Sequence, residues 1–203
     1  NFSAKTLSQF DVLVMPSGYY SNLRSEEQLN GLKDWVRSGG KLIAIDQAVN
    51  VFADRDGFGL KSIEPESSDK SNMIPYGDRE RHSVKDLITG SIYKVHLDTT
   101  HPLAFGYSDL YFSLKQDDDA YLKLERGYNV GYFDGPAESY SGFSGSDAKK
   151  KLSDSFVFGE YPLGQGSMVY LTDDILFRSF WENGKLFFVN SLFMVDANVF
   201  ILD

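Results

Sequence analysis

The sequence predicts an α/β fold: one open, mostly parallel β-sheet covered by helices on both faces, giving three layers. A strand–helix–strand pattern over residues 11–50 and a continuous apolar segment at 184–195, suited to a helix packed on a sheet, indicate this class. The chain has 203 residues, of which 42% are hydrophobic. This is enough for one domain with a substantial core, so we expect a single domain over residues 1–203.

The first half of the pattern is a short strand followed by a helix. Residues 11–15 form an apolar run that ends at Pro16-Ser17-Gly18, as expected of a buried parallel strand. Ser25 and Gln28 have the spacing of a capping box, which predicts that a helix begins there. Apolar side chains then recur at helical spacing, so the helix buries one stripe. The members of this stripe are Leu29, Leu32, Trp35 and Val36.

The second half is a strand that follows a glycine pair. Gly39-Gly40 ends the helix, and residues 41–45 form a second apolar strand. A right-handed crossover makes the two strands parallel, so their carboxyl ends, near Gly18 and Asp46, lie on the same edge of the sheet. We expect any site at that edge.

The rest of the chain predicts further strands beyond an irregular insertion. Residues from about 54 to 90 are rich in Ser, Asp, Glu, Gly and Pro, which is typical of an excursion from a domain. After it, several short alternating segments are expected to be strands, some of them antiparallel, and two longer ones flank a turn as a hairpin. The short segments are 91–97, 110–114, 121–124 and 128–133, and the hairpin segments are 155–161 and 166–172.

Composition restricts the classes of partner and chemistry. The net charge of −9 repels phosphate backbones, so we expect no nucleic-acid partner. The absence of cysteine excludes disulfides, thiolate zinc sites and a cysteine nucleophile. No run reaches the roughly 18 apolar residues that a membrane-spanning helix needs. The first residues contain neither an initiator Met nor a signal-peptide core, so we expect the chain to be part of a longer protein.

Two segments, Pro16-Ser17-Gly18 and residues 39–50, resemble class I glutamine amidotransferases, which have a flavodoxin-like fold. In that family the second segment ends in a nucleophile elbow, Cys-x-Gly-x-Gln, and the first lends N–H groups to an oxyanion hole. Here Asp46 occupies the Cys position, Ala48 the Gly position and Asn50 the Gln position. The resemblance therefore implies the fold without the reaction, because a carboxylate that attacks an amide forms an unstable anhydride.

A closer resemblance extends over nearly the whole chain. Features within residues 14–18, 98–107 and 173–181 are similar to the amidotransferase-like domain that follows the catalytic domain in bacterial zinc carboxypeptidases. This resemblance implies a non-catalytic accessory domain that packs against the carboxypeptidase domain of the same chain, in the periplasm or outside the cell. Zinc is expected in that parent catalytic domain and not in this segment, where no His-x-x-Glu pair occurs.

Two further hypotheses concern the strand carboxyl ends. One is a small-molecule, sugar or peptide binding module that uses a vestigial pocket. The other is a hydrolase that pairs Asp46 with Asp174, since paired carboxylates can perform acid–base chemistry. The alternative to the hydrolase hypothesis is structural. One residue of Asp173-Asp174 caps a helix that begins near Ile175, and the other is solvated. The predicted pocket residues are Ser17, Gly18, Tyr19, Asp46, Gln47, Asp173 and Asp174.

Three other groups of residues have side chains that can bind metal ions, but we expect them to have structural roles. His96, Asp98 and His101 have suitable side chains, but one strand and a turn seldom close a complete site, so we expect no metal here. The triplet 117–119 and the segment 54–57 lack the spaced oxygen ligands of an EF-hand loop. Both are expected to be turns.

Overall fold

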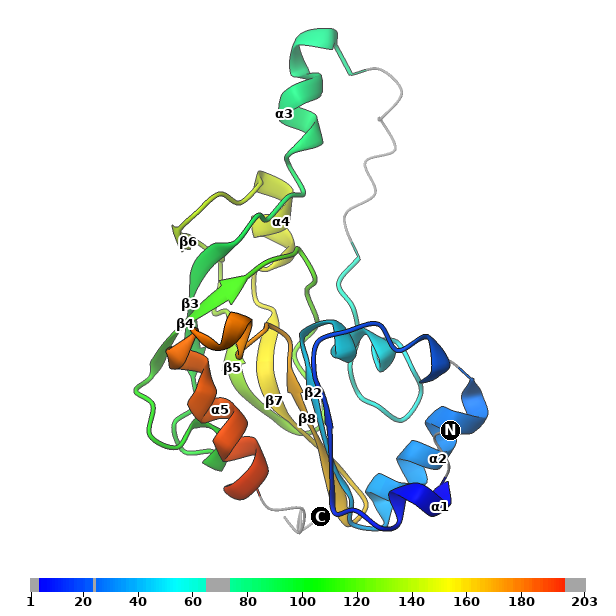
Figure 1. Cartoon of the computed structure of the whole chain (residues 1–203). Helices are drawn as coiled ribbons and strands as arrows, with labels where there is room; N and C mark the ends of the chain where they lie inside the picture. Colours follow the sequence, from blue (N-terminus) through cyan, green and yellow to red (C-terminus); the bar gives the residue numbers. More distant parts are fainter. Residues whose placement is uncertain (1–3, 24, 65–73, 196–203) are drawn as a thin grey trace.

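The computed structural model describes residues 4–23, 25–64 and 74–195, which form one sheet with helices on both sides (Figure 1). The eight described strands are ordered β1–β2–β8–β7–β5–β3–β4, and β6 pairs with β3. The strands are β1 (Val12–Met15), β2 (Lys41–Ile45), β3 (Ser91–Leu97), β4 (Leu110–Lys115), β5 (Tyr128–Tyr132), β6 (Ser139–Ser141), β7 (Phe156–Leu163) and β8 (Gly166–Leu171). The α-helices are α1 (Ala4–Leu7), α2 (Glu26–Arg37), α3 (Arg79–Ser83), α4 (Ser146–Lys151) and α5 (Glu182–Phe193).

The sheet is open and mixed, with its parallel part at the β1 edge. Strand β2 pairs in parallel with β1 and with β8, whereas the pairings of β3 to β8 among themselves are antiparallel. Figure 1 shows α2 and α5 on opposite sides of this sheet. Alternate residues of β2 accordingly enter two cores: Leu42 and Ala44 pack with α2, and Ile43 and Ile45 belong to the core that contains Phe187 of α5. The predicted three-layer α/β fold is confirmed, with the parallel pairing of its sheet confined to β1, β2 and β8.

Helix α2 forms as its sequence predicts. The Ser25 hydroxyl accepts a hydrogen bond from the backbone N–H of Gln28 at 3.3 Å. The same hydroxyl donates its proton to Gln28 Oε1 at 2.9 Å, and the two bonds fix the first turn. All four residues of the apolar stripe are buried against β2 and β8. The helix is followed by Gly39, whose φ of 114° lies in a region that favours glycine.

Helix α5 buries only one of its faces. Phe187 is fully buried and stacks on Tyr107 with ring centroids 4.2 Å apart. Asn190 donates its amide to the carbonyl groups of Leu103 and Phe105, at 2.9 and 2.8 Å, and so ties α5 to η5 (Pro102–Ala104). Large apolar side chains are also exposed toward the C-terminal end of the helix, so the predicted core segment is only partly core. These are Val189 and Phe193 of α5, and Met194, which follows it.

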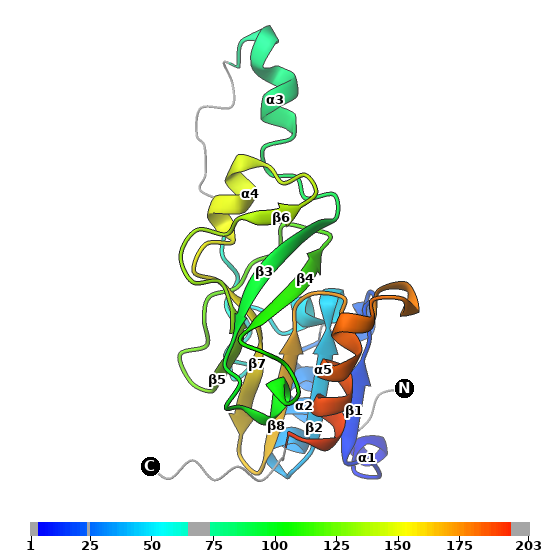
Figure 2. The same cartoon turned by 90° about the vertical axis from the view of Figure 1, so that its left-hand side faces the viewer.

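The predicted insertion divides into a packed part and a projecting part. Phe58 and Leu60 are buried in the core on the α2 side. The turn η4 (Tyr76–Asp78) and helix α3 project away from the sheet (Figures 1 and 2), while residues 65–73 of the insertion lie outside the described part. Residues 121–124 do not form the predicted strand, because Tyr121 makes only isolated bridges, to Ser62 and Phe156.

No helix within the described ranges has the length and apolar character needed to cross a bilayer.

The α5 core contact can be tested with two phenylalanines on one helix. Phe187→Ala removes a fully buried ring and should lower the free energy of unfolding by about 3–5 kcal/mol. Phe193→Ala removes a ring that is 77% exposed and should change it by less than about 0.5 kcal/mol. Chemical denaturation of both variants measures the difference, and equal losses would show that the assignment of the buried face is wrong.

Candidate functional site

The turn after β2 has the backbone geometry of a nucleophile elbow. Asp46 begins η2 (Asp46–Val51) immediately after the strand, and its φ of 52° lies in the left-handed region that non-glycine residues rarely adopt. A strained strand-to-helix turn of this kind presents its side chain at the carboxyl edge of the sheet. The chain therefore has the elbow backbone, with a carboxylate in the place of the nucleophile.

The Asp46 carboxylate is held by the loop that follows β1. Ser17 donates its hydroxyl to Asp46 Oδ2 at 2.5 Å, as the parallel pairing of β1 with β2 makes possible. Burial raises the pKa of Asp46, while the Ser17 hydroxyl and the backbone N–H of Gln47 act in the opposite direction. The nearby charges of Asp173 and Asp174 raise this pKa further. Asp46 is thus a fixed, partly desolvated carboxylate.

A second group of carboxylates reaches this edge from the loop after β4. Gln47 donates its amide to Asp117 Oδ2 at 2.9 Å, and Asn50 donates to Asp119 Oδ2 at 2.8 Å and to Gln47 Oε1 at 3.3 Å. Tyr121 donates its hydroxyl to Asn50 Oδ1. The loop at 117–119 was predicted to be a turn, and sequence reasoning missed its contact with η2. The one available signal was its position shortly after a predicted strand.

A buried ion pair lies behind this network. Lys115 Nζ is 2.9 Å from Asp173 Oδ1, with the two side chains 2% and 4% exposed, and Ser113 donates its hydroxyl to the other carboxylate oxygen. Burial lowers the pKa of Lys115, but the neighbouring carboxylates of Asp173, Asp117 and Asp119 outweigh it and raise this pKa above its usual value. Asp173 therefore anchors the end of β8 to β4, and the expectation of a solvated residue at 173–174 does not hold for it.

Asp174 caps a turn, as one of the two interpretations of this pair predicted. Its Oδ1 accepts the N–H of Leu176 at 3.0 Å. Burial raises the pKa of Asp174, this hydrogen bond lowers it, and the charge of Asp173 raises it. Because one carboxylate is occupied by Lys115 and the other by the backbone, neither member of the pair is placed as a free acid–base group for Asp46.

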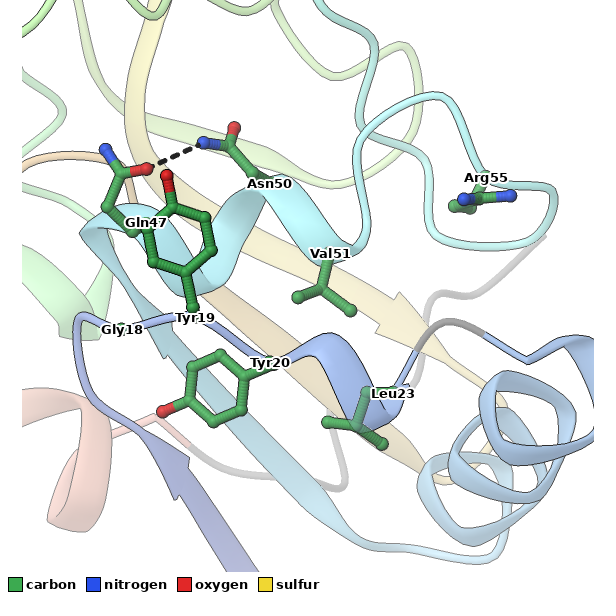
Figure 3. A pocket seen from close by; sticks show the side chains of 8 residues that line it. All are labelled: Gly18, Tyr19, Tyr20, Leu23, Gln47, Asn50, Val51 and Arg55. Atoms are coloured by element: carbon green, nitrogen blue, oxygen red, sulfur yellow. Dashed lines mark hydrogen bonds between the residues drawn. The ribbon is translucent and has the colours of Figure 1, made fainter.

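A pocket of about 370 Å³ opens beside the elbow (Figure 3). Three of the predicted pocket residues line it, namely Gly18, Tyr19 and Gln47. Ser17 and Asp46 precede lining residues in the chain, whereas Asp173 and Asp174 do not line the pocket. The lining also contains residues that the sequence analysis did not select. These are Tyr20, Leu23, Asn50, Val51 and Arg55.

The two histidines with ligand-like spacing, His96 and His101, contact other side chains and the backbone. His96 is exposed on β3 and stacks on Tyr132. His101 is buried, its Nδ1 accepts the N–H of Leu103 at 3.1 Å, and its Nε2 lies 3.1 Å from Glu160 Oε2. Across the described ranges, no group of three or more His, Asp or Glu side chains is arranged to hold a metal ion.

Comparisons with known proteins support the fold. No family model matches the sequence, and a comparison with curated proteins gives no match either. Among solved structures, a ThuA-like protein from Bacteroides uniformis has a TM-score of 0.52 at 11% identity and covers 94% of this chain and 71% of its own. The N-terminal domain of mmIFT52 has a TM-score of 0.52 at 10% identity, with 99% and 84% covered.

A second ThuA-like protein, from Parabacteroides merdae, has a TM-score of 0.43 at 14% identity and covers 82% of this chain and 60% of its own. ThuA-like proteins have a class I glutamine amidotransferase-like fold. The chain therefore has this fold, built on a flavodoxin-like open sheet. At these identities the likeness extends to the fold alone.

The buried ion pair predicts a large effect of removing one charge. Lys115→Met leaves Asp173 buried without its cation and should lower the free energy of unfolding by about 3–5 kcal/mol. The double variant with Asp173→Asn should regain part of the lost free energy of unfolding, because it no longer buries an uncompensated charge. Lys150→Met, at a side chain that is 74% exposed, is the matched control. Chemical denaturation gives the values, and a loss no larger than that of the control would contradict the pair's role.

The acidic edge predicts that stability increases as the pH falls from 8 to 5. Burial raises the pKa of Asp117 to about 6 despite the opposing charge of Lys115, and the carboxylates of Asp119, Asp173 and Asp46 add to the rise. The folded protein then binds a proton that the unfolded chain, with the ordinary value of 3.8, does not bind until lower pH. Stabilisation is therefore gained as pH falls through about 6 and is complete below 3.8.

The size of this effect is about 3 kcal/mol between the two limits, since each pKa unit corresponds to about 1.4 kcal/mol. Asp117→Asn should flatten the dependence of the melting temperature on pH between 8 and 5. Asp109→Asn, an exposed residue, removes one charge from the same net total and should leave the slope unchanged. If the melting temperature of Asp117→Asn depends on pH as steeply as that of the unchanged protein, the pH dependence arises from net charge instead.

Proposed function

We propose that this chain is a non-catalytic accessory domain of a secreted or periplasmic zinc metallocarboxypeptidase. The observation that carries the proposal is the elbow at Asp46, whose strained backbone is present while its carboxylate is held by Ser17 at 2.5 Å. In class I glutamine amidotransferases, the loop after the first strand supplies N–H groups to an oxyanion hole. In this chain the same loop supplies the Ser17 hydroxyl to Asp46, the residue at the nucleophile position. This arrangement supports a domain that keeps the fold without acyl transfer.

The placement of basic groups also supports the loss of the reaction. A nucleophile at an elbow needs an adjacent base that a third group orients. His101 is buried against Glu160, and His96 stacks on Tyr132 at β3. Among the described residues, the groups bonded to Asp46 are the Ser17 hydroxyl and the Gln47 N–H, and neither is a base.

Exposed apolar side chains support a packed partner domain. Val189 and Phe193 near the C-terminal end of α5, and Met194 just after it, are 45%, 77% and 43% exposed, and Phe105 of the adjoining η5 loop is 61% exposed. Apolar groups gathered on one element of a soluble domain are typical of an interaction surface. A carboxypeptidase domain of the same chain, as the sequence resemblance implies, is the partner we propose for it.

The intact mass and the zinc content of the natural gene product test this proposal directly. An antibody raised against this chain would capture the protein from its source. We expect a mass well above the 22.9 kDa of these 203 residues, with about one zinc ion per molecule, as one catalytic site of three protein ligands requires. A natural product of about 22.9 kDa without zinc would overturn the accessory-domain proposal.

A second candidate function is a small-molecule, sugar or peptide binding module. The specific observation in its favour is the pocket of about 370 Å³ beside Asp46, which lies within the size range of small-molecule sites and has tyrosine and amide side chains in its lining. Binding to the folded state alone raises apparent stability, so a ligand of this pocket should raise the melting temperature. The two functions are compatible, since an accessory domain can carry a ligand.

A further inference from the structure

We propose that the pocket beside Asp46 binds a zwitterion whose ammonium and carboxylate groups lie at opposite ends of an apolar chain, as in a short peptide with free termini. This inference rests on the second candidate function, that the pocket is a binding site, and it specifies the chemical class of the ligand. The argument depends on a difference in charge between the two ends of the pocket.

One end of the pocket is backed by carboxylates. Gln47 and Asn50 line that end (Figure 3). Their side chains are hydrogen-bonded to Asp117 and Asp119 respectively, and Asp46 is the residue before Gln47. These acids exceed the cations beside them, since the nearby Lys115 is paired with Asp173. An ammonium group at this end would be attracted by the excess negative charge.

Two aromatic rings lie at the same end. Figure 3 shows the rings of Tyr19 and Tyr20 on the side of Gln47, away from Arg55. The Tyr20 hydroxyl donates to the carbonyl group of Pro16 at 2.6 Å, which fixes that ring, while Tyr19 is 90% exposed and free to close over a ligand. Tyrosine faces attract ammonium groups, so the rings and the carboxylates favour the same charge.

The opposite end carries a cation. Figure 3 shows Arg55 across the pocket from Gln47, with Leu23 and Val51 between them. The Arg55 guanidinium forms no ion pair or side-chain hydrogen bond with any other residue in the described part of the chain. A guanidinium binds a carboxylate through two parallel hydrogen bonds. The apolar side chains between the two ends suit the middle of the ligand.

The separation of the charges selects among ligand classes. A neutral sugar uses neither end, and an α-amino acid carries both charges on one carbon, whereas Gln47 and Arg55 lie on opposite sides of the pocket (Figure 3). A short peptide carries its free amino and carboxyl groups at its two ends, with its side chains between them. It therefore matches the order of charged and apolar groups along the pocket.

Calorimetric titration of the full natural chain with trialanine tests this inference. We expect trialanine to bind, and N-acetyl-trialanine and trialanine amide each to bind at least tenfold more weakly. Arg55→Met should weaken trialanine binding at least tenfold and should abolish the preference for trialanine over its amide. The same variant should keep the preference over the N-acetyl peptide, because the acidic end is unchanged. Arg126→Met, at an exposed arginine outside the lining, should change nothing.

Three other outcomes would overturn the inference, and they differ in whether they also overturn the second candidate function. Equal binding of the free and blocked peptides, or unchanged binding after Arg55→Met, would show that the charged ends do not select the ligand. Binding of a neutral trisaccharide that Tyr19→Ala abolishes, without binding of trialanine, would keep the pocket as a binding site and overturn the zwitterion. If neither compound binds, the second candidate function is wrong as well. The mass and zinc measurement is independent of all these results.

Discussion

The ion pair between Lys115 and Asp173 is the interaction on which the arrangement of the candidate site depends. It joins the last residue of β4, at one edge of the sheet order, to Asp173, two residues beyond the end of β8 in the parallel part. Both charges are taken out of water, so the pair is favourable only because the Ser113 hydroxyl and the close geometry satisfy the carboxylate. By fixing the end of β4, the pair places the loop with Asp117 against η2 and brings its carboxylate to the elbow.

The part of the fold that local signals determine could be predicted from sequence. The capping pair Ser25 and Gln28, the apolar stripe of α2 and the two apolar strands around it lie within 40 residues of one another, and each signal depends on near neighbours in the chain. The carboxyl-edge position of Asp46 follows from them, because parallel strands joined by a right-handed crossover place their ends together. The elbow backbone and its Ser17 contact lie where that reasoning put the site.

The remainder of the site depends on contacts between distant residues, which carry no local pattern. Gln47 and Asp117 are 70 positions apart, and nothing in the sequence around either residue indicates the other. Asp173 looks like its neighbour Asp174 in the sequence, yet one is buried in an ion pair and the other caps a turn. Apolar periodicity also could not separate the faces of α5, because the exposed side, with Phe193, is as apolar as the buried side.

The same hydrogen bonds that hold the elbow decide how its charge can act. Asp46 accepts the Ser17 hydroxyl and the N–H of Gln47, so its oxygens are directed to the protein and its orientation is fixed. In the proposed complex, the ligand would meet the amides of Gln47 and Asn50, which line the pocket and are hydrogen-bonded to Asp117 and Asp119. Negative charge in that position attracts a cation through the field of the site without losing its own hydrogen bonds on binding. The hydrogen bonds that fix Asp46 at the elbow therefore also fix the position of its charge beside the proposed binding pocket.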